Sequence, residues 1–412
     1  MRFAIDTGDA DTATRLGAAL SWFWTARSEH VVAATLLPAA GELPGEASPD
    51  ARAVCLVVGA VSAAAVATDF DGLIERLERA RALNPGTWAE HPMLVLLEPL
   101  AAMLAGNEQE AFDLLERSPE PTDPWTRATR WLLGAMLHEN EGHFEEHRGY
   151  LKRALEGYRE VGDRWGLASA LAATGSVQLA DGDVEGSVEA YAEAHRLMAE
   201  ITVNEDASYT RTRLAAAYAR GGDVPRARAE LAAAKAEAER SGSPIGLASV
   251  HMGMADLARE SGDPAEARRL AEVALSAIES VHGGPPQMIV VMQAFLATLD
   301  ADDGDPDAGR TRIRAAVSLP MADRDMPVMG MAALALAYVE LRAGRSDESA
   351  RLFGAALALR GIEDRGSTQV DELRGQLAAA LGDDRLEQLY QDGAALPREQ
   401  AMGLLRGSAD AG

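Results

Sequence analysis

The sharpest chemical motif in this 412-residue sequence is His143-Phe144-Glu145-Glu146-His147. It fits the H-x-x-E-H zinc signature of certain metallopeptidases. On a helix, His143 and His147 would share one face, as two ligands of one metal must. The motif has no second metal-site motif to accompany it, and it falls where a turn between helices is expected. We therefore expect no catalytic or metal site here, with His147 filling a helix crossing and His143 exposed. A zinc-binding protein or metallopeptidase centred on this motif is the least favoured alternative.

The other residues of chemical interest fit structural roles. Acidic pairs such as Asp302-Asp303 and Asp383-Asp384 fall at expected turns, where carboxylates cap helices. The single cysteine, Cys55, lies in an apolar run and is expected to be a buried small hydrophobe. Neither Lys follows a Gly, so the sequence holds no P-loop. These patterns predict a protein that is not an enzyme and needs no cofactor.

Composition excludes several other classes of protein. The formal net charge is −25, which argues against direct nucleic-acid binding because that requires clustered Lys and Arg. No apolar signal segment follows Met1, and the most membrane-like run, residues 53–68, is shorter than the roughly 20 residues that a membrane span needs. We therefore expect a cytoplasmic protein that does not enter the membrane.

A repeat of about 40 residues organises most of the chain. The expected turn glycines recur at intervals of 40 or 42 residues, and four of them precede an Asp that can cap the next helix. A period of this size is typical of a solenoid of helical hairpins. The turn glycines are Gly142, Gly182, Gly222, Gly262, Gly304 and Gly344.

Three segments are expected from this pattern. Residues 1–124 contain less regular helical repeats, residues 125–360 contain the regular ones, and residues 361–412 form shorter helices that cap the last repeat. Breaks between helices are expected at Asn84-Pro85-Gly86, among other places, and the end after Gly407 is expected to fray. Because residues 1–7 look like the end of a helix, we expect the chain to be part of a longer protein.

Small residues at fixed positions of these hairpins resemble tetratricopeptide repeats (TPRs). That family has small side chains where its two helices cross, and each turn glycine is taken as position 15 of its consensus. Position 27 is Ala in all six repeats, position 8 is Ala or Gly, and position 20 is small except at His147. The position-27 residues are Ala154, Ala194, Ala234, Ala274, Ala316 and Ala356. The resemblance implies an all-α, right-handed α-solenoid superhelix of about nine hairpins, although the usual TPR period is 34 rather than 40.

In TPR superhelices the first helix of each hairpin lines a concave groove, which implies a ligand-binding or partner-binding surface here. The expected groove is a mixed surface of thioethers, phenols, hydroxyls and a few charges. A protein or peptide partner, a small-molecule effector, or both are the expected occupants. The groove residues implied by the resemblance are Met136, Tyr209, Thr212, Met252, Asp256, Arg259, Met331 and Tyr338.

A narrower resemblance comes from three phrases: WFWTARSEH near the start, GDRWGLA from Gly162, and ARLFGAA from Ala350. They are similar to the C-terminal helical sensor region of large actinobacterial transcriptional regulators of the SARP-like and large LuxR-type groups. That resemblance implies a non-catalytic sensing and protein-interaction module in transcription regulation, with homodimerisation possible. The alternative is a stand-alone TPR scaffold that binds a peptide or partner protein.

Overall fold

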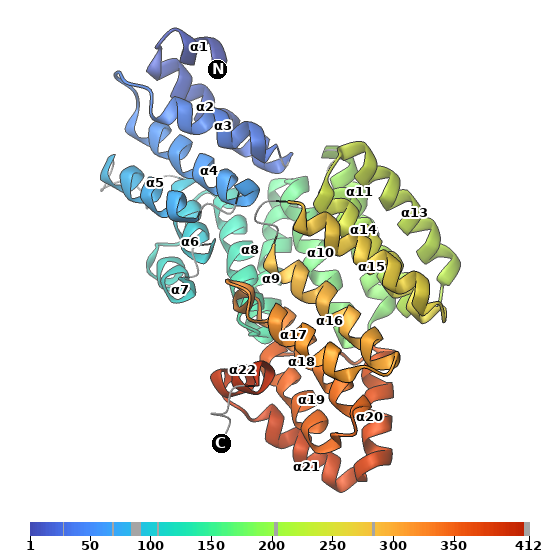
Figure 1. Cartoon of the computed structure of the whole chain (residues 1–412). Coiled ribbons are helices and arrows are strands. Elements are labelled where there is room, and N and C mark those ends of the chain that lie inside the picture. Colours follow the sequence, from blue (N-terminus) through green and yellow to red (C-terminus); the bar gives the residue numbers. More distant parts are fainter. Residues whose placement is uncertain are drawn as a thin grey trace. The chain divides into compact units, whose positions relative to one another are not determined.

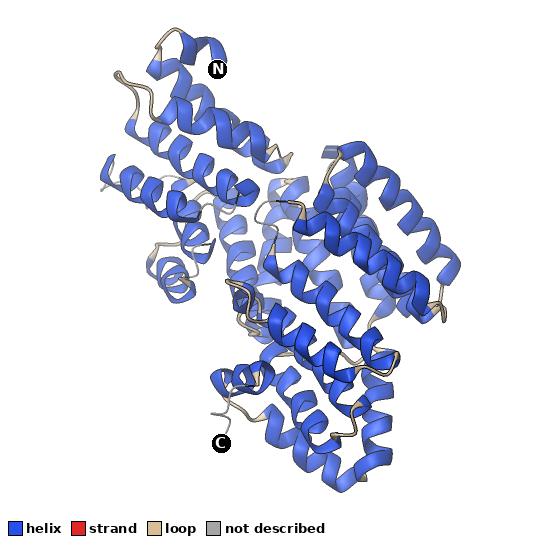
Figure 2. Ribbon diagram, in the orientation of Figure 1, coloured by secondary structure: helices blue, strands red, loops and turns tan. Residues whose placement is uncertain are grey.

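The computed structural model describes residues 1–27, 29–67, 70–83, 92–104, 107–201, 205–281 and 285–407, and these form helices joined by short loops (Figures 1 and 2). The expected break at 84–86 and the tail after Gly407 lie outside these ranges. No helix among the described residues is long and apolar enough to cross a membrane.

The helices of the first part of the chain match the sequence expectation to within a few residues. They are α1 (Arg2–Asp6), α2 (Ala10–Ala26), α3 (His30–Gly41), α4 (Pro49–Ala67), α5 (Phe70–Leu83), α6 (Leu94–Leu104) and α7 (Glu108–Arg117). The regular repeats follow as α8 (Pro124–Asn140), α9 (Phe144–Val161), α10 (Arg164–Asp181), α11 (Val184–Ile201), α12 (Glu205–Arg220), α13 (Val224–Ser241), α14 (Pro244–Glu260), α15 (Pro264–Glu279), α16 (Pro286–Asp302), α17 (Pro306–Ala316), α18 (Met326–Arg342) and α19 (Ser346–Arg360).

The turns between paired helices are built as the repeat predicts. All six turn glycines have positive φ, between 73° and 92°, which ends a helix at no steric cost only for glycine. The Asp that follows four of them then caps the next helix. Asp183, Asp223, Asp263 and Asp305 accept a hydrogen bond from the backbone N–H three residues later, at 3.0 or 3.1 Å.

The helix crossings are also as predicted. The alanines at position 27 are all buried, and so are the residues at position 20. Ser187 Oγ donates to the carbonyl of Gly175 at 2.9 Å, and Ser349 Oγ donates to that of Ala337 at 2.5 Å. At the equivalent Gly309, a β-carbon would lie 2.7 Å from the carbonyl oxygen of Ala297. A small residue at position 20 fits against the backbone of the partner helix, whereas the first regular repeat buries His147 there.

Three further helices follow the regular repeats. They are α20 (Thr368–Leu381), α21 (Asp383–Ala394) and α22 (Arg398–Arg406). Helices α21 and α22 pack on α19, and Leu386, Leu389 and Leu405 join its core cluster. Gly354 allows this packing, because a β-carbon there would overlap the carbonyl of Tyr390.

The chain forms two compact units. Unit 1 comprises residues 1–137, 149–170 and 197–204, and unit 2 comprises residues 138–148, 171–196 and 205–412. In unit 1 the core of α2, α3 and α4 includes Leu37 and Cys55. Cys55 is fully buried, as predicted, and burial raises the pKa of its thiol to about 12. Unit 2 contains the larger core cluster around α16, α18 and α19.

Candidate functional site

The zinc-like motif is divided between a turn and a helix. His143 is exposed and precedes α9, which begins at Phe144, whereas His147 is buried inside α9. The exposed His143 and the buried His147 agree with the expectation that His147 fills a helix crossing. No group of three or more His, Cys, Asp or Glu side chains that could hold a metal ion occurs among the described residues.

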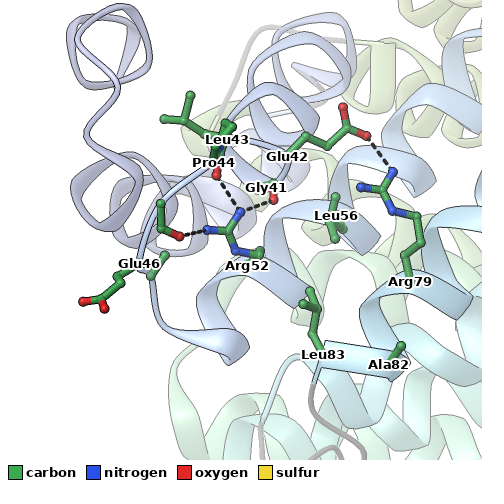
Figure 3. Close-up of a pocket in the computed structure, with 12 residues that line it drawn as sticks. Gly41, Glu42, Leu43, Pro44, Glu46, Arg52, Leu56, Arg79, Ala82 and Leu83 are labelled. Atoms are coloured by element: carbon green, nitrogen blue, oxygen red, sulfur yellow. Dashed lines mark hydrogen bonds and ion pairs between the residues drawn. The ribbon is translucent and has the colours of Figure 1, made fainter.

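A surface pocket of about 750 Å³ lies in unit 1 between the loop that follows α3 and the helices α4 and α5 (Figure 3). Both arginines that line this pocket already have partners within the chain. The Arg52 guanidinium donates to the carbonyls of Gly41, Leu43 and Gly45, and Arg79 pairs with Glu42 at 3.2 Å (Figure 3). Both arginines that line the pocket are therefore paired, and neither is left as a free cation for a ligand.

The residues expected to line a groove belong mostly to unit 2. We call the surface formed by the first helices of its hairpins the inner face. It is defined by Glu139, Ser176, Tyr209, Arg213, Arg220, Asp256, Arg259, Thr298, Met331 and Tyr338. Met136 belongs to unit 1, where it is exposed.

The structure separates the expected groove residues by depth. Tyr209 and Met331 are 50 % and 42 % exposed, which is unusual for side chains of this size. Thr212 and Met252 are only 7 % and 8 % exposed, so the expectation that they present a binding surface is corrected. Thr212 contacts the site of Gly253 on the next hairpin, since a β-carbon there would lie 2.9 Å from its methyl group. Both side chains pack between repeats instead of facing the groove.

Asp256 and Arg259 are partly exposed polar groups of α14. Their closest charged atoms are 3.9 Å apart, so the pair is loose. Arg259 also donates to Thr298 Oγ1 at 3.3 Å and lies over the ring of Phe295. The Asp256 side chain is half exposed, yet desolvation raises its pKa to about 6.

Side chains from hairpins that are not neighbours converge on the inner face. The charge of Arg213 on α12 lowers the pKa of Glu139, from α8, although burial raises that pKa overall. Asp325 caps α18, and burial is the main reason why its pKa is raised. The charge of Glu139 adds to this rise. These groups come from the first, third and last regular hairpins. Their charges are therefore near enough to interact, although their hairpins are not neighbours in the sequence.

The loop between α19 and α20, residues 361–367, closes one side of unit 2, and we call it the strap. The Arg220 guanidinium donates to both carboxylate oxygens of Asp364, at 2.7 and 3.4 Å, and Arg360 donates to the same carboxylate at 2.9 Å. The Arg365 N–H donates to the carbonyl of Ala180 at 2.9 Å. In a simple solenoid each repeat contacts only its neighbours, whereas this strap joins residues 144 positions apart.

Tyr338, on α18, already has partners within the chain. Its hydroxyl donates to Asp302 at 2.5 Å, and Arg342 pairs with the same carboxylate at 3.1 Å. Burial together with this negative partner raises the pKa of Tyr338 to about 12. The phenol is therefore neutral at pH 7 and is already used as a donor.

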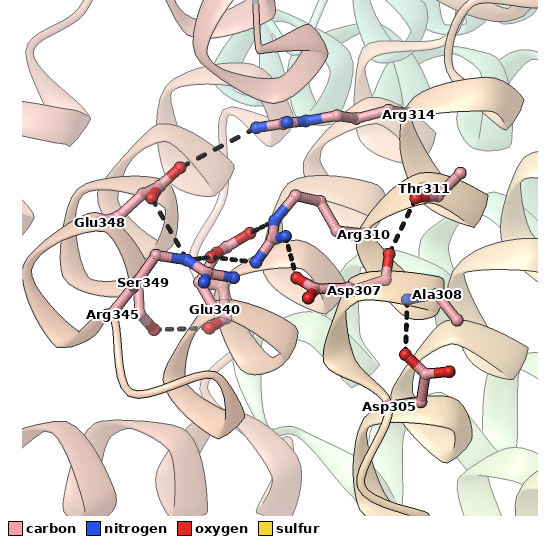
Figure 4. Close-up of polar contacts among 11 residues, drawn as sticks. Asp305, Asp307, Ala308, Arg310, Thr311, Arg314, Glu340, Arg345, Glu348 and Ser349 are labelled. Atoms are coloured by element: carbon pink, nitrogen blue, oxygen red, sulfur yellow. Dashed lines mark hydrogen bonds and ion pairs between the residues drawn. The ribbon is translucent and has the colours of Figure 1, made fainter.

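A second polar cluster, around Glu340, lies within the packed hairpins rather than on the inner face (Figure 4). The Glu340 carboxylate is completely buried and accepts hydrogen bonds from Arg310, at 2.5 and 3.1 Å, and from Arg345. Desolvation raises its pKa, and the arginines counter this. Because each charge is satisfied by the others, the cluster joins α17, α18 and α19 and offers no site.

Two functional candidates were missed by the sequence analysis. Arg213 stands at position 6 of its repeat, outside the inward-facing set of the resemblance, and Asp364 lies beyond the regular repeats. The spacing of Arg213 from Tyr209, four residues on one helix, is the signal that would have placed both on one face. Nothing in the repeat pattern marks Asp364, because its partner belongs to a hairpin distant in sequence.

The chain matches no protein-family model and no curated protein. Among solved structures, it is similar to a Rap protein complexed with competence and sporulation factor, with a TM-score of 0.56, 14 % identity, and coverage of 84 % of this chain and 99 % of that one. A STAND protein with a tetratricopeptide repeat sensor from Pyrococcus horikoshii gives a TM-score of 0.47 at 14 % identity, over 84 % of this chain and 52 % of that one. The likeness to the Rap protein, together with the helical hairpins described above, shows an all-α, TPR-like solenoid fold.

Proposed function

We propose that this chain is a non-catalytic binding module whose inner face, in unit 2, takes a peptide or a segment of a partner protein. The observation that carries the proposal is the mixed character of that face. It combines exposed Tyr209 and Met331 with polar groups that remain accessible although protein surrounds them, such as Asp256. Aromatic and thioether side chains adapt to irregular partners, and desolvated polar groups give orientation.

The structural comparison supports a ligand of this kind by analogy. The Rap protein, to which the chain is similar in fold, is complexed with competence and sporulation factor. At 14 % identity the likeness concerns the fold, so the occupant of the inner face is inferred from its own residues.

Within this function, we favour the sensor region of a bacterial transcriptional regulator over a stand-alone scaffold. The support is the resemblance of the WFWTARSEH, GDRWGLA and ARLFGAA phrases to such regions. Binding would act by favouring one of two assembly states, and its effect is limited by the difference in affinity for the two. An in-frame ATPase immediately upstream in the gene would support the regulator, and an independent promoter at Met1 would favour the scaffold.

The binding proposal is tested with a random octapeptide library and the purified chain. Wild type is expected to enrich a subset of peptides that also raise its unfolding midpoint. The double variant Tyr209→Ala with Met331→Ala should lose this enrichment. The matched control is Val273→Ala, which removes an apolar side chain that is 40 % exposed. Val273 lies on α15, the second helix of its hairpin, and so does not belong to the inner face. Failure of wild type to enrich any peptide, or equal loss in the control, would contradict the proposal.

A further inference from the structure

Arg213 is a cation on the inner face without a carboxylate partner. Its Nε donates to Tyr191 Oη at 3.4 Å and its Nη2 to Ser176 Oγ at 3.3 Å. No acidic side chain of the described part of the chain lies within ion-pairing distance of it. Both hydrogen bonds are longer than the usual N–H···O distance, and a guanidinium has five N–H donors. Most of its N–H donors therefore make no hydrogen bond within the described part of the chain.

The position of Arg213 is nevertheless well defined. Tyr191 is almost fully buried in α11, and Ser176 lies on α10, so two hydroxyls from the preceding hairpin orient the guanidinium. Tyr209 lies one helical turn earlier on α12 and exposes half of its surface beside it. The groups that hydrogen-bond the cation are thus neutral hydroxyls, and the nearby carboxyl of Glu139 acts on it only through its charge.

Arg220 shows what an arginine on this part of α12 does when a carboxylate is available. It is seven residues, or two turns, after Arg213, so the two lie along one stripe of the helix. Arg220 holds the Asp364 carboxylate through two donors. The strap thus supplies a carboxylate partner for Arg220 at one end of the stripe. At the other end, no acidic side chain of the described chain pairs with Arg213.

We propose that Arg213 binds a carboxylate of the segment that occupies the inner face, with Tyr209 packing against the residue that carries it. This inference rests on the proposed function and adds the chemistry of the ligand. The groups around Arg213 favour a single carboxylate over a polyanion. Glu139 and Asp256 are both close enough for Arg213 to lower their pKa values, so they would repel further negative charge.

The experiment uses three arms of a random octapeptide library. The first has a free C-terminal carboxylate and no Asp or Glu, the second is amidated and contains one Asp or Glu, and the third is amidated and has neither. Wild type is expected to enrich peptides from the first or second arm, which also tells a terminal carboxylate from a side-chain one. Peptides of the third arm should bind at least about tenfold more weakly, which is the usual effect of losing a charge-assisted hydrogen bond.

The variant Arg213→Gln should abolish the difference between the arms, and Arg213→Lys should retain part of it. The control Arg228→Gln removes the same charge from an exposed position on α13 and should behave as wild type. Equal binding of all three arms, or an unchanged preference in Arg213→Gln, would overturn the carboxylate inference while leaving peptide binding intact. If wild type enriches no arm, the proposed function fails as well. If Arg213→Gln does not fold, the comparison of arms on wild type decides alone.

Discussion

Removal of the Asp364 side chain should release the strap from helices α10 and α12 of unit 2. The carboxylate is 11 % exposed and is shared by Arg220 and Arg360, whose side chains are 24 % and 22 % exposed. Breaking a fully buried ion pair costs about 3–5 kcal/mol. Both guanidinium groups keep a path to water, and Arg220 still donates to the Leu179 carbonyl. We therefore expect Asp364→Ala to lower the free energy of unfolding of unit 2 by about 1–3 kcal/mol.

Denaturant unfolding and amide hydrogen exchange measure this effect. The Arg365 amide, which donates to Ala180, should exchange faster in the variant. A double-mutant cycle with Arg220→Ala should give a coupling energy of at least about 1 kcal/mol. The matched control is Asp323→Ala, which removes a carboxylate from an exposed pair with Arg406 and should cost about 0–1 kcal/mol. Equal effects of the two substitutions, or a coupling near zero, would refute the strap as a closing contact.

Three other predictions concern parts of unit 2 away from the ligand. Glu340→Gln should destabilise the fold by about 2–4 kcal/mol in denaturant titrations, because it removes the buried negative charge that pairs with both Arg310 and Arg345. Gly361→Ala should lower the thermal midpoint, since φ is 76° and a β-carbon would overlap a carbonyl, whereas Gly375→Ala, in open space within α20, should have little effect. Burial lowers the pKa of His195, so the unfolded state binds more protons; stability should fall as pH drops below about 6.5, and His195→Asn should reduce that fall.

The sequence by itself determined the repeat, and hence most of the secondary structure. Glycine at each turn is required by a positive φ, and alanine at position 27 is required by the close crossing of two helices. These constraints act within one hairpin, so they recur with its period and can be found without knowing how hairpins pack.

Only the tertiary structure decided which positions of the first helices are available to a ligand. Thr212 and Met252 fit the inward-facing pattern but are covered by packing between repeats, whereas Tyr209 stays exposed. The position of the Arg213 guanidinium, which makes no ion pair among the described residues, and the strap contact of Asp364 both depend on side chains from other hairpins. Exposure and ion pairing are set by neighbours that are distant in the sequence. A periodic pattern within each repeat carries no information about them.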